Sequence, residues 1–154
     1  MAQTRTVSPE LRARTERLQE RTFEFAKRVL NLCPKRFADE PSRVIWRQLV
    51  RSAPAASGIL EEADEASSDD EFIYKMKSVL RETKESRRWL KFIAACELQQ
   101  YRQLAALPDE ARQLCAIFAT IVRNTEDRLE REKAERDRQK SVRGAGKRPL
   151  AGAR

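Results

Sequence analysis

Apolar and small residues recur along most of this chain at alternating steps of three and four, which is the period of an amphipathic α-helix. In the first such segment one line of apolar and small residues runs from Leu11 to Leu32. A second, parallel line consists of Phe23, Ala26, Leu30 and Cys33. Ser8 and Pro9 suit a helix start, and Pro34 ends the pattern. The pattern predicts a helix over residues 8–33 that packs against two neighbours.

The same period predicts three further helices, over residues 42–65, 69–103 and 108–138. The second contains the small residues from Ser52 to Gly58 and an interior proline, Pro54, which predicts a bend there. The third begins with a capping box, because Glu71 follows Ser68 by three residues. In the fourth, the apolar line stops at Leu129, and alternating charges continue beyond it.

Four amphipathic segments joined by short connections predict an all-α fold, an antiparallel up-down four-helix bundle over residues 8–138. The chain has only four glycines, and three of them lie in the last eleven residues, so its body favours helix over sheet. Residues 1–7 are expected to be a flexible N-terminus. Residues 139–154, which contain basic residues and no acid, are expected to be a disordered basic tail.

Charge and cysteine content narrow the class of protein. A formal net charge of +8 favours a polyanionic partner. The three cysteines are far apart and lie among apolar helix positions, which is typical of reduced thiols in a cytoplasmic protein. The N-terminus has no apolar signal segment, and the longest uncharged apolar run is too short to span a bilayer.

The chain contains no histidine, so it lacks the usual general base and the commonest metal ligand. It also has no glycine-rich phosphate loop. We therefore expect a protein that is not an enzyme and that has no cofactor, metal site or small-molecule substrate. A nuclease would need a general base other than histidine, and none is placed for that role.

The arrangement of basic residues is the feature of the sequence that points to a function. Five cations recur in steps of four and three along one face of the third helix: Lys77, Arg81, Lys84, Arg88 and Lys91. Such a stripe can follow a phosphate backbone, although it can also be a solvated face whose cations pair with acids. The tail adds further candidates for nucleic-acid binding: Lys140, Arg143, Lys147 and Arg148.

The third helix also carries more apolar surface than a solitary bundle needs. Trp89 and Phe92 lie beside its main apolar line, with Glu82 and Glu85 on the same side. Aromatic residues are enriched at subunit interfaces, and an uncovered aromatic patch is uncommon on a monomer. We therefore expect these four residues at a homo-oligomer interface, with burial of the aromatic pair in the core as the alternative.

Several segments, in this order and spacing, resemble a known family: RTFEFAKRVLNL, QLVRSA, EEA, FIYKM and RETKESRRWLKFI. They are similar to the bacterial four-helix-bundle proteins encoded in 23S rRNA intervening sequences, over about Leu18 to Val122. The resemblance implies an antiparallel bundle that forms a ring of five subunits, with no known catalysis. A related branch resembles the accessory proteins of diversity-generating retroelements, which bind a reverse transcriptase and its nucleic acids. The family usually has Asn at the position of Ile59.

Two hypotheses follow. In the first, the chain is a non-enzymatic, homo-oligomeric bundle, a pentamer by the resemblance, that associates with structured RNA or a nucleoprotein complex. In the second, it is a protein-interaction scaffold or accessory subunit, for example of a reverse transcriptase, and does not bind nucleic acid directly.

Overall fold

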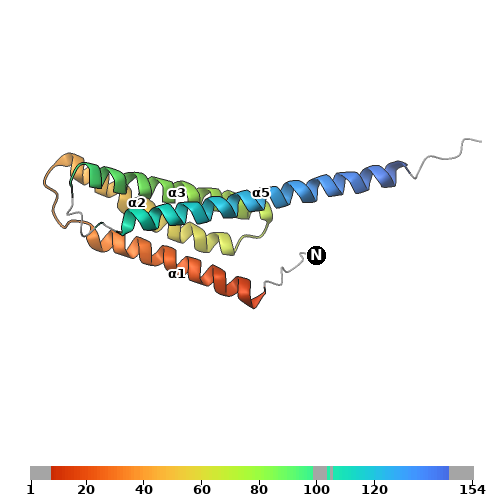
Figure 1. Ribbon diagram of the computed structural model, residues 1–154, viewed down its shortest axis with the longest axis horizontal. Coiled ribbons are helices and arrows are strands. Elements are labelled where there is room, and N and C mark those ends of the chain that lie inside the picture. The colour runs from red at the N-terminus through yellow and green to blue at the C-terminus, as the bar shows by residue number, and fades with distance from the viewer. Residues whose placement is uncertain (1–7, 99–103, 105, 146–154) are drawn as a thin grey trace, which may run out of the picture.

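In the computed structural model four helices follow one another: α1 (Pro9–Leu32), α2 (Glu40–Asp64), α3 (Asp69–Ala95) and α5 (Leu107–Ala145). The structure describes residues 8–98, 104 and 106–145, and this part of the chain contains no strand. Figure 1 shows that α1 and α3 run in one direction and α2 and α5 in the other. The predicted all-α, antiparallel up-down bundle is confirmed. Residues 1–7, expected to be flexible, lie outside the described residues.

The helix starts follow from their caps. The Ser8 hydroxyl accepts the Leu11 N–H at 3.2 Å, and the Ser68 hydroxyl accepts the Glu71 N–H at 3.1 Å. The Glu71 carboxylate reaches back to the Ser67 N–H at 2.9 Å, so the capping box is closed one residue earlier than its usual form. Helix α2 starts at Glu40, two residues before the predicted start, because Asp39 is its N-cap.

The prediction that the third helix reaches residue 103 is wrong. Helix α3 ends at Ala95, and Glu97 takes the left-handed conformation with φ of 53°. The Leu98 N–H bonds to the Ile93 carbonyl at 3.0 Å, and the Glu97 N–H bonds to the Ala94 carbonyl at 3.3 Å. These two bonds form a Schellman motif, which closes a helix C-terminus even where no glycine marks it. Residues 99–103 lie outside the described residues.

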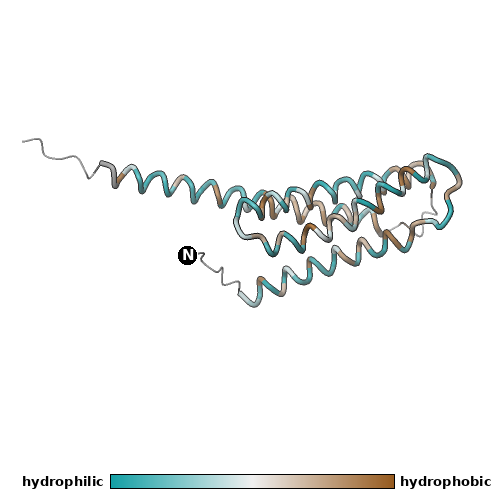
Figure 2. The backbone as a smooth tube through the Cα atoms, turned by 180° about the vertical axis from the view of Figure 1, so that it is seen from behind, coloured by the Kyte–Doolittle hydropathy of each residue, from teal (hydrophilic) through white to brown (hydrophobic). Residues whose placement is uncertain are grey.

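The predicted boundary between bundle and tail at residue 138 is also wrong. Helix α5 continues to Ala145 and projects past the other helices (Figure 1). The projecting part is mostly hydrophilic (Figure 2), and every side chain from Glu130 to Val142 is exposed. Alternating charges can hold such a segment helical without a buried face. No helix among the described residues has the length and apolar character that crossing a bilayer requires.

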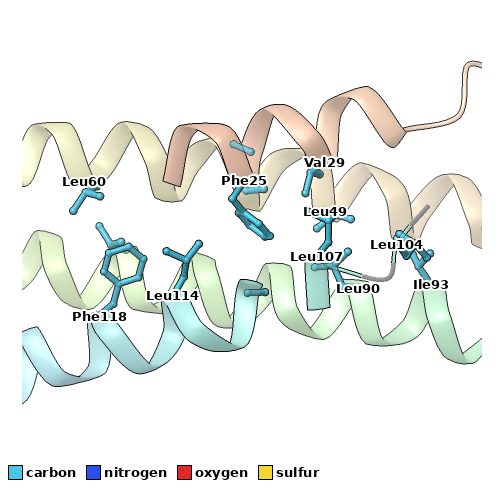
Figure 3. Packing of buried hydrophobic residues seen from close by; sticks show 14 of the residues in the cluster. Phe25, Val29, Leu49, Leu60, Leu90, Ile93, Leu104, Leu107, Leu114 and Phe118 are labelled. Carbon is cyan, nitrogen blue, oxygen red and sulfur yellow. The ribbon is translucent and has the colours of Figure 1, made fainter. Parts of the chain in front are cut away.

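The core lies between α2, α3 and the first half of α5, and the second half of α1 covers it. Figure 3 shows Phe25 and Val29 of α1 above Leu49 of α2, with Leu114 and Phe118 of α5 below. All five are essentially inaccessible to solvent. Leu104 and Ile93 meet at one end of this cluster. The core therefore stops well short of the start of α1 and of the end of α5.

Helices α2 and α3 form the most extensively packed pair. Small buried residues on α2, including Ser52, Ala53 and Ala56, allow a close approach. The Ser52 and Ser86 hydroxyls meet across the two helices at 2.8 Å, which sets the register of the pair. Helix α2 runs through Pro54 as one continuous helix.

Helix α1 diverges from the bundle toward its N-terminus (Figure 1), and its second apolar line, which lies in its C-terminal half, is only partly covered. Ala26 is buried and Cys33 is half-buried, but Phe23 is 50% exposed and Leu30 is 49% exposed. Leu11, on the first line, is exposed as well. The two predicted apolar lines are therefore each buried only in part, the first at Thr22, Phe25 and Val29 and the second at Ala26.

Candidate nucleic-acid and subunit interfaces

The five cations of the predicted stripe lie on the outward side of α3, and all of them are exposed: Lys77, Arg81, Lys84, Arg88 and Lys91. We call this set the α3 ridge. Its opposite face holds Met76, Val79 and Leu90 in the core, which is why the cations point away from the bundle. From first to last residue the ridge covers about 21 Å at 1.5 Å per residue.

Two members of the α3 ridge have acidic partners. Lys77 pairs with Glu126 of α5 at 2.6 Å, and Arg81 approaches Glu82 at 3.5 Å. Lys84, Arg88 and Lys91 make no ion pair with any described residue. The part of the ridge nearest the C-terminal end of α3 is therefore the part whose cations lack an ion pair, and we call it the uncompensated part. Of its three cations, Arg88 is near enough to Glu85 to help lower the pKa of that carboxyl.

The predicted interface residues lie at the seam between α2 and α3. Arg51 of α2, half exposed, pairs with Glu85 at 2.6 Å and approaches Glu82 at 3.7 Å. The Trp89 indole N–H donates to the same Glu85 oxygen at 3.3 Å. Burial would raise the pKa of Glu85, but the hydrogen bonds from Arg51 and Trp89 outweigh it and hold that pKa below its ordinary value.

Glu82 is the unusual member of this cluster. Its side chain is only 8% exposed, and its Oε2 atom is buried without a hydrogen-bond donor among the described residues. A buried carboxylate oxygen without a donor is costly, since its lost hydration is not replaced. The Arg51 guanidinium approaches this same oxygen, with its Nη1 atom 3.7 Å away, so the oxygen faces a cation although it accepts no hydrogen bond from a described residue.

The aromatic pair next to this cluster is only partly covered. The rings of Trp89 and Phe92 lie 5.8 Å apart between their centroids. Trp89 packs partly against the core, whereas Phe92 is 46% exposed. Trp89 is thus partly in the core and partly on the surface, so it fits both the core and the interface alternatives. Phe92 supplies apolar surface that the described residues do not cover.

The remaining predicted nucleic-acid-binding residues are on α5 and beyond it. Lys140 lies in the projecting part of α5 and is exposed. Arg143 belongs to the same helix, but its side chain lies outside the described residues, as do Lys147 and Arg148 entirely. The projecting part extends from the end of the bundle opposite the C-terminus of α3 (Figure 1), so it does not meet the uncompensated part of the α3 ridge.

The folded structure adds three basic residues to the candidate sites. Arg51 reaches across to α3. Arg87 and Arg112 line a concavity between the end of α3 and the start of α5, together with Lys91 of the ridge. The sequence gives the helical face of each residue, but it does not show which helices are adjacent, so it could not bring these residues together.

No cluster of metal ligands and no disulfide occurs among the described residues. No group of three or more Cys, Asp or Glu side chains gathers there as a metal site would require. The three cysteines are free: Cys115 is buried, Cys33 is half-buried and Cys96 is exposed. Burial raises the pKa of the Cys115 thiol, so this thiol is kept protonated and unreactive.

The fold and surface together define a helical bundle with a basic outer ridge and a partly uncovered aromatic seam. No family model matches the chain, and no curated protein matches it. Among solved structures, the chain is similar to a protein of unknown function from the S23 ribosomal protein family of Bacteroides thetaiotaomicron, determined at 1.70 Å resolution. The TM-score is 0.59 with 23% identity, and the match covers 68% of this chain and 97% of that protein. This likeness shows a shared fold.

Proposed function

We propose that this chain is a non-enzymatic helical bundle that assembles with copies of itself and associates with structured RNA. The observation that carries the proposal is the row of uncompensated cations Lys84, Arg88 and Lys91 on the α3 ridge. A rigid helix presents them at fixed spacing, and cations so arranged can replace the counterions of several phosphates at once. The fold shared with an S23 ribosomal protein family member is consistent with an RNA partner.

The test measures the affinity of the purified chain for a fluorescent RNA hairpin at a series of KCl concentrations. The triple variant K84Q/R88Q/K91Q removes three phosphate contacts. The logarithmic salt slope should then fall by about 2 to 3, and affinity near 0.1 M salt should fall on the order of 100-fold.

The matched control removes the same charge from exposed arginines of α1, as R12Q/R17Q/R28Q. It should keep the slope and lose little affinity. Equal losses in both triple variants would mean that only net charge matters, and a salt-independent affinity would contradict the proposal outright.

For self-assembly, we propose that the seam around Trp89, Phe92, Glu82 and Glu85 is covered by a second copy, in a ring of five subunits as the family resemblance implies. Phe92 is 46% exposed, so its ring would gain from a partner surface. The variant F92S should lower the mass of the assembly in solution. Y74S, at a more exposed aromatic residue on the same helix, should leave that mass unchanged.

The same seam favours a second candidate, an accessory subunit that grips a partner protein without binding RNA. Here Phe92 would meet the partner, and the α3 ridge would only be solvated. Removing residues 141–154 separates the two functions: lost RNA binding favours the first, whereas unaffected binding of the partner protein favours the second.

A further inference from the structure

A concavity lies at one end of the bundle, between the last turns of α3 and the first turn of α5. Its volume is about 660 Å³, within the range of roughly 300–1,000 Å³ that small-molecule sites occupy. Its polar rim includes Arg87 and Lys91 of α3 and Arg112 of α5. Its floor is apolar and includes Ala94, Leu104 and Pro108. Cationic and apolar side chains are thus side by side.

The charges on this rim are not balanced. Arg112 pairs with Asp109 at 2.6 Å, but Arg87 and Lys91 make no ion pair with any described residue. These two cations are one helical turn apart, where like charges repel and destabilise a helix. Lys84, one turn before them, is also unpaired. A bound anion would relieve this repulsion. Asp109, an acid that also lines the concavity, already pairs with Arg112.

The concavity also continues the α3 ridge, because Lys91 belongs to both. A strand that follows the ridge along α3 would therefore reach the concavity at the end of the helix. The floor is partly formed by Leu104, which is itself fixed in the core beside Ile93 (Figure 3), so this surface has a firm support.

We propose that this concavity binds an unpaired nucleotide of the RNA. Arg87 and Lys91 hold its phosphate, and the base lies over Ala94 and Pro108, with the buried Leu104 beneath them. The inference rests on the proposed function, and it adds that the protein prefers RNA with an unpaired end or loop. A base inside a duplex cannot reach such a floor, whereas a splayed base can bury its face on it.

The first experiment titrates the full chain, labelled with ¹⁵N, with AMP, adenosine and inorganic phosphate, and follows the amide signals. AMP should give saturable shifts centred on residues 87–95 and 107–112, and adenosine should bind at least tenfold more weakly. The variant R87Q/K91Q should abolish these shifts. K77Q/R81Q, with the same charge change on the same helix, should keep them. All four substituted residues are exposed, so both variants should fold.

The second experiment compares a blunt RNA hairpin with the same hairpin carrying an unpaired overhang. The wild-type chain should bind the overhang form about tenfold more tightly, R87Q/K91Q should lose this preference, and K77Q/R81Q should keep it. Equal binding of both hairpins by the wild type, with no AMP shifts at the concavity, would overturn the inference and leave general RNA binding intact.

Two other outcomes are equally decisive. If inorganic phosphate binds as tightly as AMP, the apolar floor has no role and a nucleotide site is wrong. If AMP binds at the concavity while no RNA binds at any salt concentration, the RNA function fails and the nucleotide site is supported independently of it.

Discussion

The hydrogen bond between Ser52 and Ser86 is a sensitive probe of how α2 and α3 pack. Both side chains are completely buried, and their hydroxyl oxygens are 2.8 Å apart. The Ser86 hydroxyl is also 3.0 Å from the Glu82 carbonyl, and the Ser52 hydroxyl is 3.3 Å from the Leu49 carbonyl. The two hydroxyls have one proton each to donate, and there are three possible hydrogen bonds, so only two of these bonds form at one time. The shorter contacts favour donation from Ser52 to Ser86 and from Ser86 to the Glu82 carbonyl.

Replacement of either serine by alanine removes the bond between the helices, at a cost of about 1 kcal/mol. The higher helix propensity of alanine returns up to about 0.5 kcal/mol at each site. In the double variant the shared bond is lost only once, and the propensity gains add. The double variant should therefore be less destabilised than the sum of the two single variants by about 0.5–1 kcal/mol, which is the coupling energy of the pair.

The assay is urea unfolding of the wild type, S52A, S86A and S52A/S86A at one chain concentration, since assembly would make stability depend on concentration. Equal m-values would show that the free energies are comparable. A coupling energy below about 0.3 kcal/mol would refute the reasoning. It would mean that the two hydroxyls do not meet, and that α2 and α3 pack in another register.

Three further predictions concern the end of α3, the α2–α3 seam and the projecting part of α5. Glu97→Gly should stabilise the fold by about 0.5–1 kcal/mol in urea unfolding, because glycine adopts the left-handed conformation without the penalty that Glu97 meets, whereas Glu97→Ala should not. Since the folded-state pKa of Glu85 is lowered, its ionisation stabilises the fold above its ordinary pKa, and that contribution disappears as the pH falls through the lowered value. Unfolding followed from pH 6 to pH 3 should therefore show a smaller loss of stability in E85Q than in the wild type, and parallel curves would contradict this. Deletion of residues 130–154 should leave the thermal midpoint nearly unchanged, because every side chain from Glu130 to Val142 is exposed, and a large drop would show that this segment packs on the bundle.

The number and order of the helices could be predicted from periodicity, because apolar residues at steps of three and four must face a common core. Their antiparallel direction follows from the short connections between them. Caps such as Ser8 and Ser68 placed the helix starts to within about two residues. The helix ends were less predictable. The end of α3 depends on a left-handed Glu97, a residue type that gives no such signal, and α5 extends through charged residues that need no core.

The candidate sites were predictable only in part, because a helical period gives the face of a residue and not its neighbour. The α3 ridge is correctly placed on one exposed face. The pairing of Arg51 with Glu85 depends on the register of α2 and α3, and the cationic concavity depends on α5 lying beside α3. Phe23 and Leu30 have the pattern of packed residues but are half exposed in the folded chain.

The measurement that tests self-assembly most directly is the mass of the purified full chain in solution, by light scattering coupled to gel filtration. A single chain has a mass of 17.9 kDa. The account predicts a particle of close to 90 kDa for five copies, present at micromolar concentration and without added RNA. A particle of 17.9 kDa at every concentration would contradict it, because the apolar seam at Phe92 would then remain uncovered in the isolated protein.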